Sequence, residues 1–313
     1  MPFKHIPVMV NEVLRHMDCK RGKIYVDCTL GGAGHAKAIL GKIIPDGMLI
    51  GIDQDEDAIE NGKNVLKPFA ANTHLFHSNF IHFSDVLSQL NIPAVDGILL
   101  DLGISLHQLE LSGRGFSFKR DEPLDMRMDK DSNPPAEEII NRLEEGALKK
   151  IFHEHGEERW ARRIAKQIVK ARKSERIRSS RQLARIVVDA VPSGSSSQRI
   201  HPATRVFMAI RIEVNRELEN LDRFMKNAVD YLNDKGRLCI LSFHSLEDRI
   251  VKRRIKALEK GCVCPPDFPK CVCDKKQLAI SLSRKAVRPS GAEVRANPMA
   301  RSAKLRVMEK ISI

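Results

Sequence analysis

The chain has 313 residues, 42% of them hydrophobic, so it is long enough for one large or two ordinary domains and apolar enough for a substantial core. Its formal net charge of +13 favours polyanionic partners, with nucleic acid the leading class, although ribosome-associated and membrane-surface proteins can share this balance. Aromatic residues make up only 5%, which disfavours a protein that binds single strands by stacking bases on aromatic rings.

The sequence has no run of about 18 apolar residues, the length that a membrane-spanning helix needs. Its first residues, MPFKHIPVMVNEVL, lack the basic and then apolar order of a secretory signal. We therefore expect a cytoplasmic protein that does not enter a membrane. The seven cysteines are an odd count without a secretory signal, which favours reduced thiols.

Short apolar runs alternate with helical patterns in the first hundred residues. Residues 23–28, 47–53, 73–78 and 95–103 are typical of strands, and the segments between them suit helices. The continuous apolar character of GILLDL predicts a strand that is covered on both faces. The fold class that we predict is α/β, with a Rossmann-like, doubly wound parallel sheet.

The alternation stops after residue 110, where charge-rich helical sequence continues to about residue 200. A long helix near 203–232 and a turn at 233–236 then lead to a fifth strand at 237–243, and 303–309 is a last strand candidate. We therefore predict a discontinuous core, 1–110 and 203–313, with a helical domain inserted at 111–202.

A glycine-rich turn, in VDCTLGGAGHAKAIL at residues 26–40, follows the first predicted strand. Its glycines, Gly31, Gly32 and Gly34, allow backbone N–H groups and a helix N-terminus to approach a ligand. A dinucleotide fingerprint is incomplete, because Lys37 stands where its third glycine would be. Asp27 would repel a pyrophosphate but suits the cationic S-adenosylmethionine. A purely structural turn is the alternative.

Two further positions indicate a nucleoside. Asp53 ends the second predicted strand about 20 residues after the glycines, at the spacing where a carboxylate accepts ribose hydroxyls. Asp55 or Asp57 is better explained as a cap or first-turn acid of the next helix. Phe80 could lie against adenine, and simple core packing is its alternative.

Asp101 ends the fourth predicted strand, and a buried acid there would need a partner. Many amino-methylating enzymes have a D/N/S-P-P-aromatic motif at this point, whereas this chain has Asp101, Leu102, Gly103 and Ile104. The motif alone therefore does not indicate an ordinary DNA amino-methyltransferase.

Four later segments are candidates for substrate contact. Residues 114–129, which include Arg114, suit either a lid or a structured connection. Arg159 to Arg185 holds eleven Lys or Arg against one acid, which exceeds the mixed charge of an ordinary solvated helix and indicates a surface that faces nucleic acid. HPATR places His201 and Arg205 near the substrate, although Pro202 is ordinary at a helix start. His244, Ser245 and Arg249 follow the fifth strand, where a capping box of Ser245 with Asp248 is the alternative.

Four cysteines cluster in CVCPPDFPKCVC, namely Cys262, Cys264, Cys271 and Cys273. Thiolates at this spacing could bind a structural zinc ion, although C-x-x-C pairs are commoner in zinc sites. A reduced, thiol-rich loop without metal is the alternative. A catalytic role is disfavoured, because nothing nearby activates a nucleophile.

The segments DLGIS, RGFSFKRDEPLDMRMD, HPATRVFMAIRIEVNREL, SFHSLEDRIVKR and NPMARSAKLR occur in this order. Across nearly its whole length the chain resembles the bacterial ribosomal RNA small-subunit methyltransferase H family, of MraW type, which methylates cytosine N4. The resemblance implies a class I S-adenosylmethionine-dependent methyltransferase fold with a helical insertion, acting on one cytidine in the decoding region of 16S rRNA. It implies cofactor contacts at Ala33, Gly34, His35, Asp53, Phe80, Asp101 and Gln108. His35 and Gln108 rest on the resemblance alone.

The cytosine amine is a poor nucleophile, so positioning must contribute much of the catalysis. Asp101 could accept the amine hydrogens or hold the cofactor, and no general base is assigned because the methylated amine is acidic enough to lose its proton to water. We name His244, Arg249, Arg114 and Arg205 as substrate contacts and the small ribosomal subunit as partner, and leave a homodimer open. A small-molecule methyltransferase and a non-catalytic RNA-binding assembly factor are the alternatives, and the basic insertion disfavours the first.

Overall fold

The structure is a computed structural model that describes residues 7–192, 200–262, 264–265, 268–270, 272–273 and 275–312. The chain forms two compact units, of which the first joins the chain up to Gly103 with the chain from Leu218. The second unit comprises Ile104–Glu217, so it extends beyond 111–202 at both ends. It includes residues 203–215 because their apolar side chains pack in its core.

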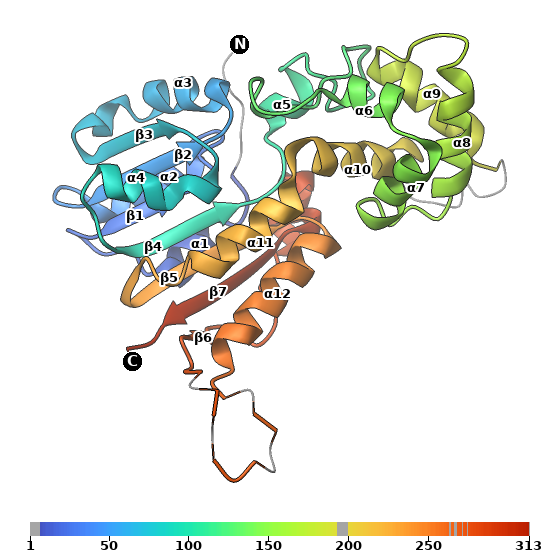
Figure 1. Cartoon of the computed structure of the whole chain (residues 1–313). Coiled ribbons are helices and arrows are strands. Elements are labelled where there is room, and N and C mark those ends of the chain that lie inside the picture. Colours follow the sequence, from blue (N-terminus) through green and yellow to red (C-terminus); the bar gives the residue numbers. More distant parts are fainter. Residues whose placement is uncertain are drawn as a thin grey trace. The chain divides into compact units, whose positions relative to one another are not determined.

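The first unit contains a seven-stranded sheet with the order β3-β2-β1-β4-β5-β7-β6 (Figure 1). The strands are β1 (Ile24–Asp27), β2 (Met48–Asp53), β3 (Thr73–His77), β4 (Val95–Asp101), β5 (Leu232–Ser242), β6 (Ala279–Ser281) and β7 (Lys304–Lys310). β7 runs antiparallel to β5 and β6, and all other neighbours are parallel. The carboxyl ends of β1, β2 and β4 therefore lie at one edge of the sheet.

Both faces of the sheet are covered by helices, as the continuous apolar strands predicted. Alternate strand residues face two apolar cores, so that Val26 and Ile50 belong to one core and Tyr25 and Leu49 to the other. The first core is completed by helices on one face, α4 (Phe83–Gln89), α11 (Glu217–Asn227) and α12 (Ser245–Glu259). The second is completed by α1 (Val10–Met17), α2 (Gly34–Ile43) and α3 (Glu56–Val65). The doubly wound α/β prediction is confirmed.

Three details of the secondary structure differ from the predictions. The long helix expected near 203–232 is two helices, α10 (Ala203–Asn215) and α11, because Arg216 between them has a left-handed backbone with φ of 51°. β5 begins at Leu232, and the expected turn at 233–236 is an irregularity in its pairing with β4. The short edge strand β6 was not predicted, since three residues carry too little periodicity to identify a strand.

The second unit is built from helices around its own apolar core. The helices are α5 (Leu106–Glu110), α6 (Ala136–Arg142), α7 (Glu145–Glu154), α8 (Ala161–Ala171), α9 (Ser180–Ala190) and α10 (Ala203–Asn215). Its described part contains no strand beyond an isolated bridge between Pro123 and Ser179. Among all described residues, we find no helix with the length and apolarity to cross a membrane.

Candidate active site

The glycine turn joins β1 to α2, and two of its residues have left-handed backbone conformations. Gly31 has φ of 47°, and Ala33, which precedes α2, has φ of 59°. Gly34 has an ordinary φ, but a Cβ there would lie 2.7 Å from Cγ of Pro7. Glycine at 31 and 34 therefore has a structural explanation in backbone conformation and close packing, which is compatible with a ligand at the same turn.

Asp53 connects this turn to the end of β2. Its Oδ2 accepts a hydrogen bond from the Gly31 N–H at 2.8 Å, and its Oδ1 accepts one from the Asp55 N–H at 2.9 Å. Burial raises the pKa of Asp53 to about 6, although both N–H donors act in the opposite direction. The predicted helix cap is confirmed for Asp55, whose side chain accepts from the Asp57 N–H at 3.2 Å.

Asp27 and Thr29 connect the end of β1 to the end of β4. Asp27 is 1% exposed, and its Oδ1 accepts from the Thr29 N–H at 3.2 Å. The Thr29 hydroxyl oxygen accepts from the Asp101 N–H at 2.6 Å. Burial is the largest cause that raises the pKa of Asp27 well above its usual value, and the charges of Asp101 and Asp53 add to it. Sequence patterns offered no reason to select Thr29, because its role depends on a bond between strands.

Asp101 lies at this edge with its carboxylate next to a histidine side chain. Its Oδ2 lies 3.6 Å from Nε2 of the buried His35, and its Oδ1 has no hydrogen-bond partner among the described residues. Burial, followed by the charge of Glu247, raises the pKa of Asp101 to about 7. His35, which only the family resemblance suggested, is thus brought next to a predicted site residue.

Glu247 is a buried acid that the sequence analysis did not select. It is 2% exposed, and its Oε2 accepts from the N–H groups of Phe243 at 2.8 Å and His244 at 3.2 Å. His244 is the N-cap of α12 and forms the capping box with Glu247. The predicted box of Ser245 with Asp248 is therefore wrong by one residue. A polar residue three positions before an acid is the spacing of a capping box, so His244 and Glu247 could have been selected from the sequence, since histidine can also cap a helix.

Asp248 instead connects α12 to β7. Its carboxylate accepts from Nζ of Lys304 at 2.8 Å and from Nε of Arg306 at 2.7 Å. These two cations hold the pKa of Asp248 below its usual value, against the effect of burial. Arg249, the next residue, is exposed on α12, and its contact with substrate stays a prediction.

Phe80 occupies the core position that was its alternative explanation. Its ring is 8% exposed and packs edge-on against Phe224 with 5.5 Å between the ring centroids. The ring is fixed by this core, so an adenine contact would use only its small exposed part. The adenine contact stays a prediction.

The remaining predicted site residues lie in the second unit. Gln108 is buried and forms a capping box with Ser105 at the start of α5. Arg114 is 5% exposed and donates from Nη1 to the carbonyl oxygens of Arg127 and Met128 at 3.1 and 3.0 Å. Such a buried guanidinium stabilises the segment, which argues against the predicted contact of Arg114 with substrate. Arg205 donates to the Glu157 carbonyl at 3.3 Å.

Residues 114–129 lie within the second unit and pack into its core, so they are neither a loose lid nor a connection between the two units. Phe116, Leu124, Met126 and Met128 are buried in the core of the second unit. A Cβ on Gly115 would lie 2.3 Å from the carbonyl oxygen of Pro123, so close backbone packing accompanies this burial. A segment anchored by four core side chains lacks the loose packing that a moving lid needs.

The predicted basic stretch lies on α8, α9 and the segment between them. α8 buries Ala161, Ile164, Ala165 and Ile168, which leaves its basic side chains on the opposite face. Exposed cations of this stretch, here called the basic helical surface, are Arg159, Arg162, Arg163, Lys166, Lys170, Lys173, Arg176, Arg178, Arg181 and Arg185. Arg159 and Arg163 lie over the Trp160 ring, at 4.7 and 5.8 Å from its centroid.

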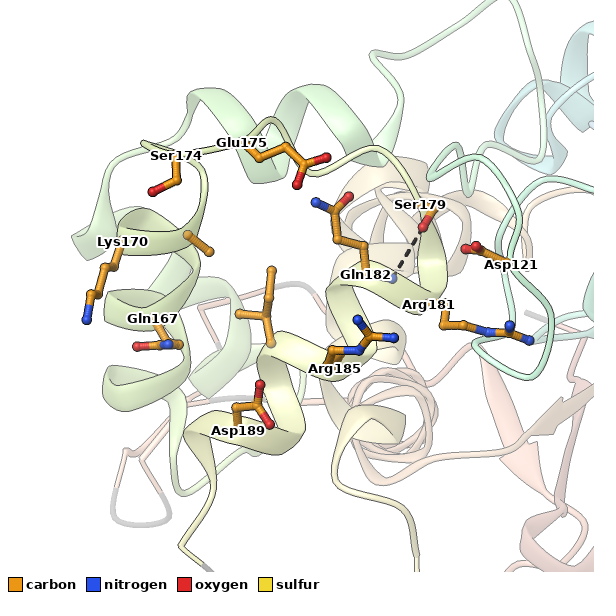
Figure 2. A pocket seen from close by; sticks show the side chains of 12 residues that line it. Asp121, Gln167, Lys170, Ser174, Glu175, Ser179, Arg181, Gln182, Arg185 and Asp189 are labelled. Carbon is orange, nitrogen blue, oxygen red and sulfur yellow. Dashed lines mark hydrogen bonds between the residues drawn. The ribbon is translucent and has the colours of Figure 1, made fainter.

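A hollow of about 450 Å³ lies between α8 and α9 (Figure 2). Lys170, Arg181 and Arg185 line it together with the acids Glu175 and Asp189. It belongs to the second unit and contains none of the residues that we predicted to hold the cofactor. Its mixed charges give it no clear preference for a ligand.

The carboxyl edge of the sheet thus gathers Asp27, Asp53, Asp101 and the neighbouring Glu247. Burial raises the pKa of the first three, and among the causes of these shifts only His77, near Asp53, is a basic side chain. A ligand cation would lower the cost of these buried charges. The sulfonium and ammonium of S-adenosylmethionine are such cations, and Asp53 can accept hydrogen bonds from a ribose. The residues therefore fit this cofactor.

Comparisons with known proteins show the family to which the chain belongs. The sequence matches the MraW methylase family over residues 2–311. Relatives include "Ribosomal RNA small subunit methyltransferase H" of Desulfosudis oleivorans, 53% identical over 99% of this chain and 100% of that protein. The protein of the same name from Desulforapulum autotrophicum is 55% identical over the same shares. A solved rRNA methylase from Streptococcus thermophilus is only 10% identical, with a TM-score of 0.42 over 97% of this chain and 94% of that one. The chain belongs to the MraW methylase family, and its first unit has the doubly wound α/β fold described above.

Proposed function

We propose that the chain transfers the methyl group of S-adenosylmethionine to the exocyclic N4 amine of one cytidine in the decoding region of 16S rRNA, in the cytoplasm. The names of the relatives support rRNA of the small subunit as substrate. The observation that carries the proposal is Asp101, a carboxylate at the end of β4 whose side chain is 15% exposed and of which one oxygen has no partner among the described residues.

Each acid at the carboxyl edge has a separate task in this proposal. Asp53 accepts the ribose hydroxyls, while Gly31, Ala33 and Gly34 bring the backbone close to the cofactor. Asp27 is too deeply buried for much contact and contributes its negative charge. When bound, the cofactor supplies the methyl group. His35 and Phe80 of the same unit are further cofactor contacts that the family resemblance implies.

Asp101 accepts a hydrogen bond from the N4 amine of cytidine. This orients the nitrogen lone pair and raises its nucleophilicity, while holding the amine in position reduces the entropic cost of the reaction. The new N–C bond forms as the S–C bond breaks, and the amine proton leaves to water. Because the ionised form of Asp101 is the acceptor, activity requires its deprotonation.

A transfer assay tests this function. The chain is incubated with labelled S-adenosylmethionine and with small ribosomal subunits, free 16S rRNA or DNA, and the nucleosides are then analysed by mass. We expect N4-methylcytidine from the ribosomal substrate. Label in none of the three, despite cofactor binding, would instead support a small-molecule methyltransferase or a non-catalytic assembly factor.

The basic helical surface is proposed to bind rRNA phosphates. Double reversal of Lys166→Glu and Lys170→Glu, two exposed α8 residues, should weaken binding to small subunits roughly tenfold or more and lower the salt dependence by about one unit per lost phosphate contact. The matched control is Lys149→Glu with Lys150→Glu, on α7 of the same unit. Titrations at several salt concentrations give the binding affinity and its salt dependence. Equal affinities of the two double variants would rule out this surface.

A further inference from the structure

A long loop connects α12 to β6, and two hydrogen bonds join the two chain segments at which it begins and ends. The Leu278 N–H donates to the Leu258 carbonyl at 3.0 Å, and the Ser281 N–H donates to the Glu259 side chain at 2.8 Å. The sequence between these contacts runs from residue 261 to residue 277, of which the structure describes 261–262, 264–265, 268–270, 272–273 and 275–277. The base of this loop is therefore held in place.

The described part of the loop has no apolar core to hold it. None of its described residues from 261 to 277 is buried. Two large apolar side chains are even exposed, Phe268 by 51% and Val272 by 68%. Loops without a core need another constraint if they are to keep one conformation, and a metal ion is a common one.

Three thiols of this loop lie together. The Sγ atoms of Cys262, Cys264 and Cys273 are all within 4.8 Å of one another, and those of Cys262 and Cys273 are 3.7 Å apart. Tetrahedral zinc with Zn–S bonds of about 2.3 Å separates its sulfur ligands by about 3.8 Å. A disulfide would need about 2.05 Å. The observed separation thus matches two thiolates on one metal ion.

Backbone donors and nearby charges also suit thiolates. The Cys264 N–H donates to Sγ of Cys262, and the Val272 N–H donates to Sγ of Cys264, both at 3.4 Å. Such bonds stabilise thiolate ligands in metal sites. Lys270, Lys275 and Lys276 are exposed in the same loop and offset the negative charge of a zinc–thiolate centre.

We propose that Cys262, Cys264 and Cys273 bind one zinc ion that fixes this loop. Each thiol loses its proton to the buffer as its Zn–S bond forms. The fourth cysteine of the sequence cluster, Cys271, lies outside the described residues, so the site is defined by the three described thiols. Soft sulfur ligands favour zinc over magnesium or calcium. The site is distinct from the carboxyl edge of the sheet and does not depend on methyl transfer.

Metal analysis of the full chain tests this site. Protein purified under reducing conditions should contain one zinc per chain, and Co²⁺ added to chelator-treated protein should produce thiolate-to-cobalt charge-transfer absorption. Cys262→Ser with Cys273→Ser should abolish both signals. Cys19→Ser, which removes a thiol of the same unit outside the loop, should keep them. With free zinc at 100 times its Kd, trypsin cleavage of the wild-type loop should slow roughly 100-fold.

Two results would overturn the proposal. One is equal metal content in the wild type and in the double serine variant, including no metal in either. The other is a disulfide between Cys262 and Cys273 in metal-free protein whose thiols were blocked at the moment of lysis.

Discussion

Replacement of Asp101 by asparagine is expected to lower kcat by roughly 10²- to 10⁴-fold, the usual contribution of a positioned proton acceptor. Asparagine keeps the shape of the side chain but presents a weaker, uncharged acceptor to the cytidine amine. The Asp101 N–H, which donates to Thr29, is unchanged by this substitution. Steady-state assays of methyl transfer to small subunits give kcat for the wild type and for the variant.

The pH dependence distinguishes this role from a simple structural one. Burial and then Glu247 raise the pKa of Asp101 to about 7, so kcat/KM of the wild type should rise with pH and level off above about 7. In kcat the midpoint should lie lower, because the cationic cofactor favours the ionised carboxylate. The asparagine variant should lack this transition. A wild-type profile that is flat between pH 5 and 8 would contradict the assignment.

Folding stability provides the control for the same variant. Because the pKa of Asp101 is raised in the folded state, ionisation of this side chain lowers the free energy of unfolding. The loss develops as the pH rises from the ordinary pKa of an aspartate to about 7, and it is at most roughly 1.4 kcal/mol per pKa unit. The uncharged amide of Asp101→Asn avoids this cost, so the variant should be at least as stable as the wild type above pH 7. Asp96→Asn, at the other end of β4, should keep its activity but lose stability, because Asp96 accepts from Ile24 and Asn233.

Replacement of Asp53 by alanine is expected to raise the Kd for S-adenosylmethionine roughly 100-fold. The estimate corresponds to about 3 kcal/mol, the contribution of two hydrogen bonds from ribose hydroxyls to a charged acceptor. The variant also loses the bond from the Gly31 N–H, which loosens the turn that precedes α2. Calorimetric titration measures the Kd, and circular dichroism should show a retained fold.

Asp46→Ala is the matched control for Asp53, because Asp46 is exposed near the opposite end of β2. Its Kd should equal that of the wild type. Burial raises the pKa of Asp53 to about 6, so wild-type affinity should fall below pH 6 as the acceptor is protonated. An unchanged Kd in Asp53→Ala would refute the ribose contact.

The carboxyl edge could be predicted from sequence because its acids follow apolar strands. Asp27, Asp53 and Asp101 each end a strand, and parallel pairing brings such ends to one edge. Thr29 and Glu247 could not be selected in this way. The role of Thr29 comes from a hydrogen bond between strands, which requires three-dimensional placement. For Glu247 only the spacing to His244 was a usable signal, and it indicates a helix cap rather than a place near Asp101.

In the second unit, the helices could be predicted from the sequence but individual contacts could not. Its helices and their basic face follow from periodicity and charge, since α8 alternates buried alanine and isoleucine with exposed cations. The burial of Arg114 could not be predicted, because charged side chains are usually exposed and this one is stabilised by carbonyls 13 and 14 residues away in the chain. The break at Arg216 has no glycine or proline to indicate it.

The measurement that tests the central claim most directly is to locate the transferred methyl group. Small subunits that lack the modification are incubated with the chain and labelled S-adenosylmethionine, and the 16S rRNA is digested and its fragments sequenced by mass spectrometry. The account predicts a single N4-methylcytidine in a fragment of the decoding region, greatly reduced with Asp101→Asn. A methyl group on another base, or label spread over many fragments, would contradict it.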